Sequence, residues 1–521
     1  MSMDREHMLA TAKELPGYWD VVVIGGGATG LGAAVEAATR GYRTLLLEQS
    51  DFAKGTSSRS TKLVHGGVRY LQQGNITLVL EALRERGLLI QNAPHLVHHQ
   101  SFIVPNYEWW GGHFYGIGMK VYDKLAGKLG LGPSKRLSKD ETLKRIPNLE
   151  PGGLKGGVNY YDGQFDDSRL AINLAQTLVD QGGVAINYAK VTGLLKSNNM
   201  INGVKVRDEE TGNEFEINAH SVINATGIFA DEVLKMDEQN HQEIIALSQG
   251  VHLVVDREFL AGDSAIMVPK TDDGRVLFAV PWHNRVVVGT TDTEVKKAEL
   301  EPRAQEEEIE FILKHAAHFM TKKPTRADVK SVFAGLRPLV RPLESKGTAA
   351  ISRDHTIMIS EAGLITIAGG KWTTYRKMGE DTIDKAALVA GLDIRESKTH
   401  NLRIHGWLKH VDRSDMLHVY GSDMVGIKKL IQSHPELDEL IHPDLPYKKA
   451  EVVWTTRNEM ARTVDDILAR RTRSLLLDAK ASKEAAPEVA KLMARELGAD
   501  DSWVQNQIHE FNELAKGYIL E

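Results

Sequence analysis

The chain of 521 residues contains no cysteine. It therefore has no disulfides, no thiolate metal ligands and no redox-active thiol pairs. This absence excludes the nucleotide-binding enzymes that cycle through a disulfide. His95, His98 and His99 lie close together in the sequence, but no carboxylate stands among them. We therefore expect no metal site at these histidines.

Long apolar runs are also missing. No stretch of eighteen apolar residues occurs, so we expect no transmembrane helix. Residues 1–16 are polar and charged, so we expect no secretory signal, and we expect residues 1–17 to be a short lead-in. A formal net charge of −6 argues against a nucleic-acid partner. We expect a cytoplasmic protein of two or three domains, because the chain is too long for one compact core.

One Gly-x-Gly-x-x-Gly fingerprint is present, formed by Gly25, Gly27 and Gly30. An apolar run precedes it and an alanine-rich stretch follows it, which predicts a buried parallel strand and then a helix. Gly25 permits the tight turn, Gly27 lets a pyrophosphate approach the backbone, and Gly30 lets the helix pack closely on the strand. Glu48 ends the next predicted strand, where an acid can bind an adenosine ribose hydroxyl. These features together predict a dinucleotide site.

A second fingerprint of this kind is absent from the sequence. A flavoprotein that also used NAD(P)H would usually need a second nucleotide domain, so we expect a single dinucleotide. Residues 364–376 instead predict a strand that ends in Gly369-Gly370-Lys371 and leads into a helix. The N-terminus of that helix would suit the negative charge of a reduced flavin.

The segment after the nucleotide unit is rich in polar side chains. Residues 54–62 carry hydroxyls, glycine and cations that can donate hydrogen bonds to a pyrophosphate or a flavin edge, although an ordinary solvated loop is the alternative. In residues 63–71, His65 is followed by two glycines and by Arg69. His65 could be an acid–base group and Arg69 an anion anchor, whereas a purely structural histidine is the alternative.

Two further helices are expected before residue 130. Residues 78–91 have helical periodicity, with Glu81, Arg84, Glu85 and Arg86 expected on the solvated side. Residues 107–129 combine Trp109-Trp110 with an apolar stripe and lysines at every fourth position. This pattern suits a helix lying on an anionic membrane, and a helix packed on the core with a solvated lysine stripe is the alternative.

Residues 244–291 contain short β-rich runs joined by hairpin signals such as His283-Asn284, which predicts an antiparallel sheet. Arg337 then stands beside proline in apolar surroundings, and Arg353 follows. Such charges are costly to bury unless an anion meets them. With Arg69, these arginines indicate an anionic substrate. After about residue 400 the pattern is helical, and residues 462–479 are expected to form the clearest helix.

The predicted fold class is α/β. We expect a FAD-binding Rossmann-like domain of the glutathione-reductase/D-amino-acid-oxidase type, an antiparallel-sheet substrate domain and a C-terminal helical domain. The expected segments are 18–75, 151–235 and 351–398 for the FAD-binding parts, 76–150 for the helical and membrane-contact segment, 236–350 for the substrate domain and 399–521 for the C-terminal domain.

Several motifs resemble the FAD-dependent glycerol-3-phosphate dehydrogenase family. They are residues 24–30, 62–71, 224–227, 335–339 with 351–356, and 369–376, and residues 463–473 resemble that family's C-terminal domain. Leu31, Glu36 and Gly379 depart from the family pattern at positions of helix packing. The resemblance implies FAD, and oxidation of sn-glycerol 3-phosphate to dihydroxyacetone phosphate by hydride transfer from C2 to flavin N5.

The resemblance also implies residue roles. The substrate contacts would be Arg69, Tyr70, Arg337, Arg353 and Lys371. The proton acceptor is left open between His65 and His252, with Arg337 and Lys371 as the other catalytic residues. The cofactor contacts would be Gly25, Gly26, Gly27, Thr29, Gly30, Glu48, Thr56, Ser57, Ser58, Gly66, Gly67, Ala225, Thr226, Gly227, Gly370, Lys371, Trp372 and Thr373.

The electron acceptor is the other open point. If the protein is a dehydrogenase, the resemblance implies that a quinone accepts the electrons. It also implies that the protein lies at the inner face of the cell membrane, with residues 107–129 as the membrane contact. A related oxidase would use oxygen and release peroxide. The third hypothesis is a binding protein with a flavin fold and no catalytic turnover. The arginines Arg69, Arg337 and Arg353 argue against it, because they indicate an anionic substrate. A homodimer is the assembly that we expect.

Overall fold

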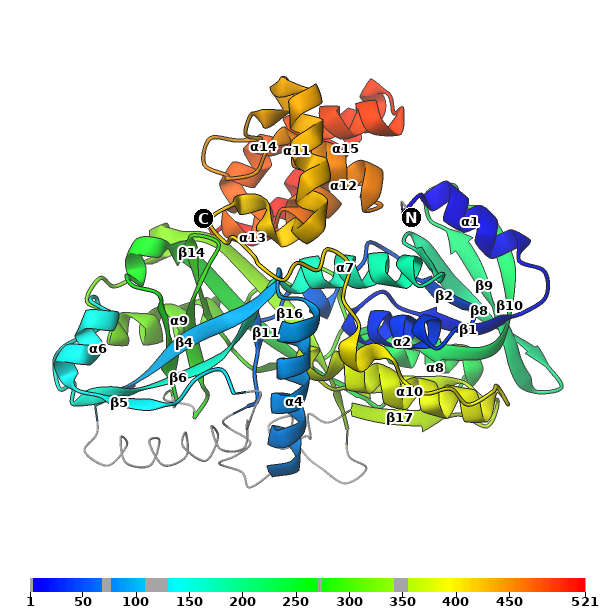
Figure 1. Ribbon diagram of the computed structural model, residues 1–521, viewed down its shortest axis with the longest axis horizontal. Coiled ribbons are helices and arrows are strands. Elements are labelled where there is room, and N and C mark those ends of the chain that lie inside the picture. Colours follow the sequence, from blue (N-terminus) through cyan, green and yellow to red (C-terminus); the bar gives the residue numbers. More distant parts are fainter. Residues whose placement is uncertain are drawn as a thin grey trace.

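The computed structural model describes residues 3–67, 76–107, 130–269, 271, 274–341 and 355–520. Two mixed sheets lie side by side, and the C-terminal helices sit above them (Figure 1). Arg69, Tyr70, Arg353 and the predicted membrane-contact residues 108–129 lie outside the described residues.

The first sheet carries the turn that contains the fingerprint glycines Gly25, Gly27 and Gly30. Its strand order is β17-β18-β10-β1-β2-β7, with β8 and β9 attached through β10. The strands are β1 (Trp19–Ile24), β2 (Thr44–Leu47), β7 (Val184–Ile186), β8 (Ala189–Ser197), β9 (Met200–Asp208), β10 (Glu214–Asn224), β17 (His355–Ile359) and β18 (Ile365–Gly369). The central strands run parallel, and β1 is buried along nearly its whole length, as its unbroken apolar run predicts.

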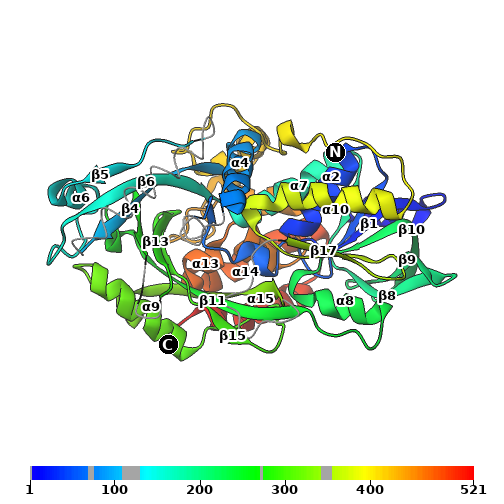
Figure 2. The same cartoon turned by 90° about the horizontal axis from the view of Figure 1, so that it is seen from below.

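Helices cover both faces of this sheet. In Figure 2, α2 (Ala28–Thr39), α7 (Asp167–Asp180) and α10 (Tyr375–Val389) lie on one side and α8 (Ala230–Asp237) lies on the other. Helices α2 and α10 cross through small residues. An added Cβ on Gly379 would lie 2.6 Å from the Gly32 backbone. Gly379, noted above as a departure from the family pattern, therefore permits a close helix crossing.

The second sheet is antiparallel except where β12 runs parallel to β4. Its order is β15-β11-β14-β13-β12-β4-β6-β3, with β16 on β11 and β5 on β6. The strands are β3 (Leu63–Val64), β4 (Val97–Asn106), β5 (Lys135–Leu137), β6 (Gly156–Phe165), β11 (Ile245–Asp256), β12 (Ser264–Val268), β13 (Leu277–Trp282), β14 (Arg285–Gly289), β15 (Thr293–Val295) and β16 (Val329–Val340). The predicted turn at His283 and Asn284 joins β13 to β14, and both residues have positive φ.

The remaining helices are peripheral or C-terminal. They are α1 (Arg5–Glu14), α4 (Ile76–Asn92), α6 (Lys139–Arg145), α9 (Glu306–Phe319), α11 (Met424–Ser433), α12 (Lys449–Asn458), α13 (Ser474–Leu477), α14 (Ala479–Leu497) and α15 (Asp501–Ala515). Among the described residues, every helix is too short or too polar to span a bilayer.

The expected lead-in contains helix α1, whose Arg5 is buried against Asp208 at 2.6 Å. Two local expectations are corrected. Helix α4 forms as predicted, but Glu85 and Arg86 are buried rather than solvated, because each pairs with a residue distant in the sequence. Residues 462–479 do not form one helix.

The segment expected to be the clearest helix is a π-helical turn, Asp466–Arg471, followed by the short α13. Arg473 has a φ of 58°, a left-handed conformation that ends the first turn. The charges at positions 465, 466, 470 and 471 are buried in ion pairs, so local periodicity does not determine this segment.

Candidate active site

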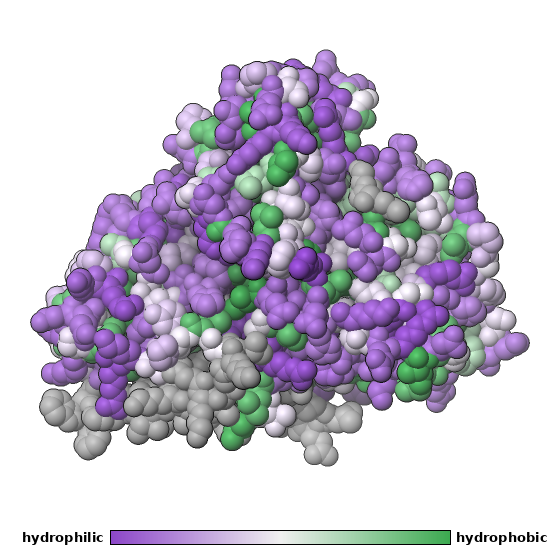
Figure 3. Space-filling model, in the orientation of Figure 1, coloured by the Kyte–Doolittle hydropathy of each residue, from purple (hydrophilic) through white to green (hydrophobic). Residues whose placement is uncertain are grey.

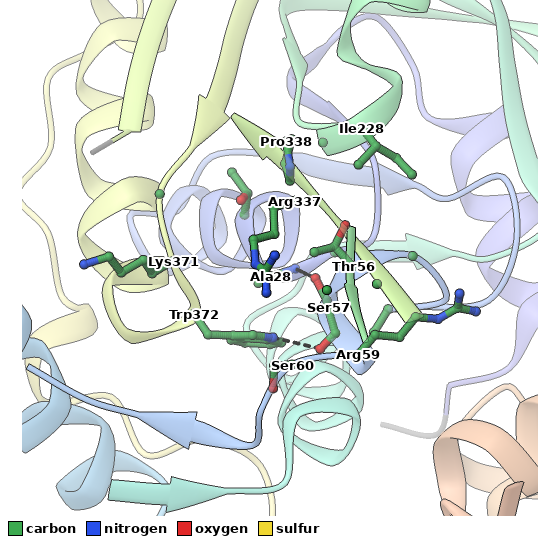
Figure 4. Close-up of a pocket in the computed structure, with 18 of the residues that line it drawn as sticks. Ala28, Thr56, Ser57, Arg59, Ser60, Ile228, Arg337, Pro338, Lys371 and Trp372 are labelled. Carbon is green, nitrogen blue, oxygen red and sulfur yellow. Dashed lines mark hydrogen bonds between the residues drawn. The ribbon is translucent and has the colours of Figure 1, made fainter. Parts of the chain in front are cut away.

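The fingerprint glycines form the predicted turn between β1 and α2. Gly25 has a φ of 109°, a backbone region that favours glycine. An added Cβ on Gly30 would lie 1.9 Å from the Gly25 carbonyl oxygen, so only glycine fits this close approach. The N-cap Gly27 supplies no capping side chain, and the Ala28 N–H donates instead to Oγ of Ser57 at 2.9 Å (Figure 4). The helix N-terminus thus meets the loop that follows β2.

Glu48 stands at the end of β2 and faces the same turn. Its carboxylate accepts hydrogen bonds from the backbone N–H groups of Gly26 at 2.6 Å and Ser50 at 2.8 Å. Burial raises the pKa of Glu48 above its usual value. Glu48 lines a cavity at the position where the fingerprint places an adenosine ribose.

A cavity of about 460 Å³ connects this nucleotide end to the second sheet. Residues of both sheets line it, so residues far apart in the sequence share its wall. The predicted site residues that line it are Gly25, Gly27, Thr29, Glu48, Thr56, Ser57, His65, Gly67, Ala225, Thr226, Gly227, His252, Arg337, Gly370, Lys371, Trp372 and Thr373. The predicted residues among those described that do not line it are Gly26, Gly30, Ser58 and Gly66.

The floor of the cavity is a ladder of β11 and β16. Ser248 is opposite Arg337, Gly250 is opposite Gly335, and His252 is opposite Phe333. Alternate residues of a strand share one face, so these three pairs point the same way. The glycine pair lets other groups lie close to the sheet: the Arg337 guanidinium lies over Gly250 and Arg59 lies over Gly335, and both glycines line the cavity.

Arg337 is held by the sheet rather than by a single partner. Its Nη1 donates to Oγ of Ser248 at 3.3 Å, and its Nη2 donates to Oγ1 of Thr290 at 3.1 Å and to the Thr291 carbonyl at 3.2 Å. Asp292 is 3.7 Å away. An added Cβ on Gly250 would lie 2.2 Å from Nη2, so the guanidinium rests on this glycine. Its position suits an anion anchor at the cavity wall.

His252 is buried on the same floor. Its ring stacks on Phe333 with 4.9 Å between centroids, and Nε2 pairs with Oγ1 of Thr61 at 2.9 Å. Burial, with the nearby Arg337 and Lys62 cations, lowers the pKa of His252 well below its ordinary value. Nδ1 has no hydrogen-bond partner among the described residues. A neutral imidazole of this kind can accept a proton from a substrate.

The turn after β18 brings Lys371, Trp372 and Thr373 to the cavity. The Trp372 Nε1–H donates to the Ser57 carbonyl at 2.8 Å, which joins this turn to the loop after β2 (Figure 4). Oγ1 of Thr373 accepts from the His65 backbone N–H at 3.2 Å. In the view of Figure 4 the Lys371 side chain extends away from Arg337. Both residues nevertheless line the same cavity.

Sequence reasoning included Arg59 and Thr61 in the loop 54–62 and Gly335 in the motif 335–339, but it assigned them no individual role, and it missed Gly250. Thr61 bonds His252, and the buried Arg59 pairs with Glu301 at 2.7 Å. These contacts join segments far apart in the chain, so local patterns do not reveal them. The glycines did leave a signal, because Gly250 and Gly335 each interrupt a β-rich run. Among the described residues, no group of three potential metal ligands is found.

The residues present fit FAD. The glycine turn could not hold side chains, Glu48 faces the ribose position, and the hydroxyls of Thr56 and Ser57 line the cavity beside the N-terminus of α2. A single cavity then continues to the sheet that carries His252. Fold and cavity together define the class of oxidoreductases in which a Rossmann-like domain would hold a dinucleotide beside the second sheet.

Comparison with known proteins also indicates a FAD-dependent oxidoreductase. The sequence model described as FAD dependent oxidoreductase matches residues 20–376, and the model described as C-terminal domain of alpha-glycerophosphate oxidase matches residues 365–504. The mitochondrial glycerol-3-phosphate dehydrogenase of Mus musculus is 39% identical over 99% of this chain and 75% of its own length. The mitochondrial enzyme named SDP6 from Arabidopsis thaliana is 37% identical over 96% of this chain and 86% of its own length.

A solved structure shows the same fold. The glycerol-3-phosphate dehydrogenase from Bacillus halodurans, complexed with FAD, has a TM-score of 0.80 and 29% identity, and the match covers 99% of this chain and 98% of that one. The chain belongs to the FAD-dependent oxidoreductase family, among its glycerol-3-phosphate dehydrogenases. Its cofactor is FAD.

Proposed function

We propose that the protein oxidises sn-glycerol 3-phosphate to dihydroxyacetone phosphate and passes the electrons to a quinone. Bound FAD supplies the hydride acceptor. The observation that carries the proposal is the single cavity that joins the fingerprint turn at Gly25 to Arg337 and His252 on the second sheet. The relatives named for this activity, matched over nearly the whole chain, support the choice of substrate.

Arg337 is proposed to bind the phosphate. A guanidinium fork matches phosphate oxygens, and the bonds to Ser248 and Thr290 hold it in place before the substrate arrives. The resemblance adds Arg69, Tyr70 and Arg353, which lie outside the described residues, and Lys371, which lines the cavity. A phosphate fixed at this end would orient the rest of the substrate along the cavity floor.

His252 is proposed as the acceptor of the substrate hydroxyl proton. Its lowered pKa keeps the imidazole neutral at neutral pH, and its bond to Thr61 and its stacking on Phe333 fix the ring. His65 also lines the cavity, and its backbone is joined to Thr373. We favour His252 because it lies on the same sheet face as Arg337, so one substrate could touch both.

A quinone acceptor and a peripheral membrane site complete the proposal. Apolar side chains gather at one end of α4, where Ile76 and Leu80 are exposed (Figure 3). Apolar side chains exposed together suit contact with a lipid surface at the inner face of the cell membrane. Residues 107–129, proposed as the main contact, directly follow β4 in the sequence.

The experiment mixes the anaerobic holoenzyme with glycerol 3-phosphate. Bleaching of the flavin absorbance is expected, and its absence would refute both the substrate and turnover. A quinone analogue and air are then admitted in separate samples. Faster reoxidation by the quinone supports the dehydrogenase, whereas rapid formation of hydrogen peroxide would assign the oxidase. Liposome flotation of a variant with Trp109 and Trp110 changed to Ser tests the membrane contact, and unchanged binding would exclude this segment.

A further inference from the structure

The C-terminal domain reaches the cofactor loop through a buried cluster of charges. Its π-helical turn supplies Asp466, Arg470 and Arg471, with Asp465 just before it. All but Asp465 are at most 2% exposed, and Asp465 is 8% exposed. These residues have no role in the proposed oxidation of glycerol 3-phosphate. They nevertheless meet a segment of the FAD-binding domain more than four hundred residues away in the sequence.

Asp51 is the centre of the cluster. Its Oδ2 accepts from Nε of Arg470 at 2.5 Å and from Nη1 of Arg471 at 2.6 Å, and its Oδ1 accepts from Nη2 of Arg471 at 3.0 Å. Asp51 is fully buried. One carboxylate thus receives two guanidinium groups from consecutive residues of the π-helical turn. Such charge-assisted bonds are strong and geometrically specific.

Lys54 closes the arrangement. Its Nζ donates to Oδ2 of Asp465 at 3.0 Å, and Nη2 of Arg470 donates to the same oxygen at 3.0 Å. Asp51 and Lys54 bracket one tight turn, in which the Lys54 N–H donates to the Asp51 carbonyl at 3.2 Å. The C-terminal domain therefore holds both ends of this turn with opposite charges.

The same turn touches the fingerprint. The Ala53 N–H donates to the Gly26 carbonyl at 2.9 Å, and both Ala53 and Lys54 line the cavity. Ala53 has a φ of 62°, an uncommon conformation that surrounding contacts must maintain. A shift of the turn would move the wall of the cofactor site and the Gly26 carbonyl contact together.

We propose that the charges of the π-helical turn are positioning residues for FAD: they hold the turn 51–54 against the fingerprint glycines, so that docking of the C-terminal domain and FAD affinity are coupled. The inference rests on FAD binding and is independent of the substrate. Coupling of this kind is reciprocal, because a domain that tightens FAD must itself be tightened by FAD.

The test compares three isosteric variants of the full-length holoenzyme. Asp51→Asn and Asp465→Asn each remove one charge from the cluster. Glu36→Gln is the matched control, because Glu36 is fully buried and bonded to Arg40 at 2.7 Å, but lies about 12 Å along α2 from the cofactor end. All three are expected to lower Tm, since removing one partner of a buried pair is destabilising.

FAD release, followed by the rise of flavin fluorescence on dilution, separates the roles. We expect release about tenfold faster in Asp51→Asn and Asp465→Asn and unchanged in Glu36→Gln. Equal release from all three would overturn the proposal. If the variants do not fold, hydrogen exchange of the wild-type chain decides. Amides of residues 463–473 are expected to exchange about tenfold more slowly with FAD than after FAD is stripped, and equal exchange would overturn the coupling.

Discussion

Removal of the Arg337 guanidinium tests the anion anchor most directly. In Arg337→Ala the bonds to Ser248 and Thr290 disappear, while the fingerprint turn and the loop after β2 keep their own contacts. The predicted result is weaker binding of glycerol 3-phosphate with the FAD content retained. Inorganic phosphate serves as a second probe, because it should compete for the same guanidinium.

The size of the effect follows from the surroundings of Arg337. A hydrogen bond to a charged group contributes about 1.5–3 kcal/mol. The side chain is 25% exposed and Asp292 lies 3.7 Å away, so solvent and a counter-ion weaken its attraction for phosphate. We therefore expect the lower part of the range, about 1.5–2 kcal/mol, which corresponds to about 10- to 30-fold in affinity.

The assay measures KM for glycerol 3-phosphate and the inhibition constant of phosphate, with flavin content from absorbance. Gly250→Ala is the positional control, because its Cβ would lie 2.2 Å from Nη2 of Arg337 and must displace the guanidinium without removing the charge. Both variants should weaken phosphate inhibition, Arg337→Ala more. Parallel loss of FAD and substrate binding in Arg337→Ala would show a structural residue and refute the reasoning.

The other predictions concern the imidazole, the fingerprint and acid stability. His252→Gln should lower kcat by about 10²–10⁴-fold with FAD retained, and near-normal turnover in steady-state kinetics would reassign the proton acceptor. Gly30→Ala should yield protein with little bound flavin although alanine favours helix by about 1 kcal/mol, because its Cβ would lie 1.9 Å from the Gly25 carbonyl; normal flavin absorbance would contradict the packing argument. Burial lowers the pKa of His95 to about 4 and that of His98 to about 3. Both stay neutral in the fold while the unfolded chain binds protons below about pH 6.5, so each should lower the unfolding free energy by up to about 1.4 kcal/mol per pH unit between pH 6.5 and 4. A Tm that is constant over this range would contradict the burial of both rings.

The nucleotide half of the fold could be predicted from the sequence because its determinants are local. A buried strand, a glycine turn and an acid at the end of the next strand occur within about thirty residues, and each has one physical role. The hairpin at His283 and Asn284 was equally local. The predicted fold class, the FAD cofactor and the family were confirmed.

Long-range ion pairs account for what the sequence did not predict. Glu85 was expected to face solvent, but both its carboxylate oxygens bond Arg376, 291 residues away, at 2.8 and 2.7 Å. The segment 462–479 was expected to be a continuous helix, but Arg470 and Arg471 within it pair with the distant Asp51. Helical periodicity describes a single helix. It contains no information about which distant residue of opposite charge will pair with a side chain of that helix.

The substrate end of the site could be predicted from the sequence only in part. Read along β11, the pattern is Ser248-x-Gly250-x-His252, and along β16 it is Phe333-x-Gly335-x-Arg337. Glycine in a strand interior is destabilising by about 0.5–1 kcal/mol, and two glycines at the same register double that cost. The glycines let the Arg337 guanidinium and Arg59 lie against the sheet, because a Cβ on Gly250 would be 2.2 Å from Nη2 of Arg337 and one on Gly335 would be 2.9 Å from Cβ of Arg59. The neutral imidazole of His252 stands at the next position on the same face of the ladder. A small substrate with its anion at Arg337 and its hydroxyl at His252 would therefore lie along the strands.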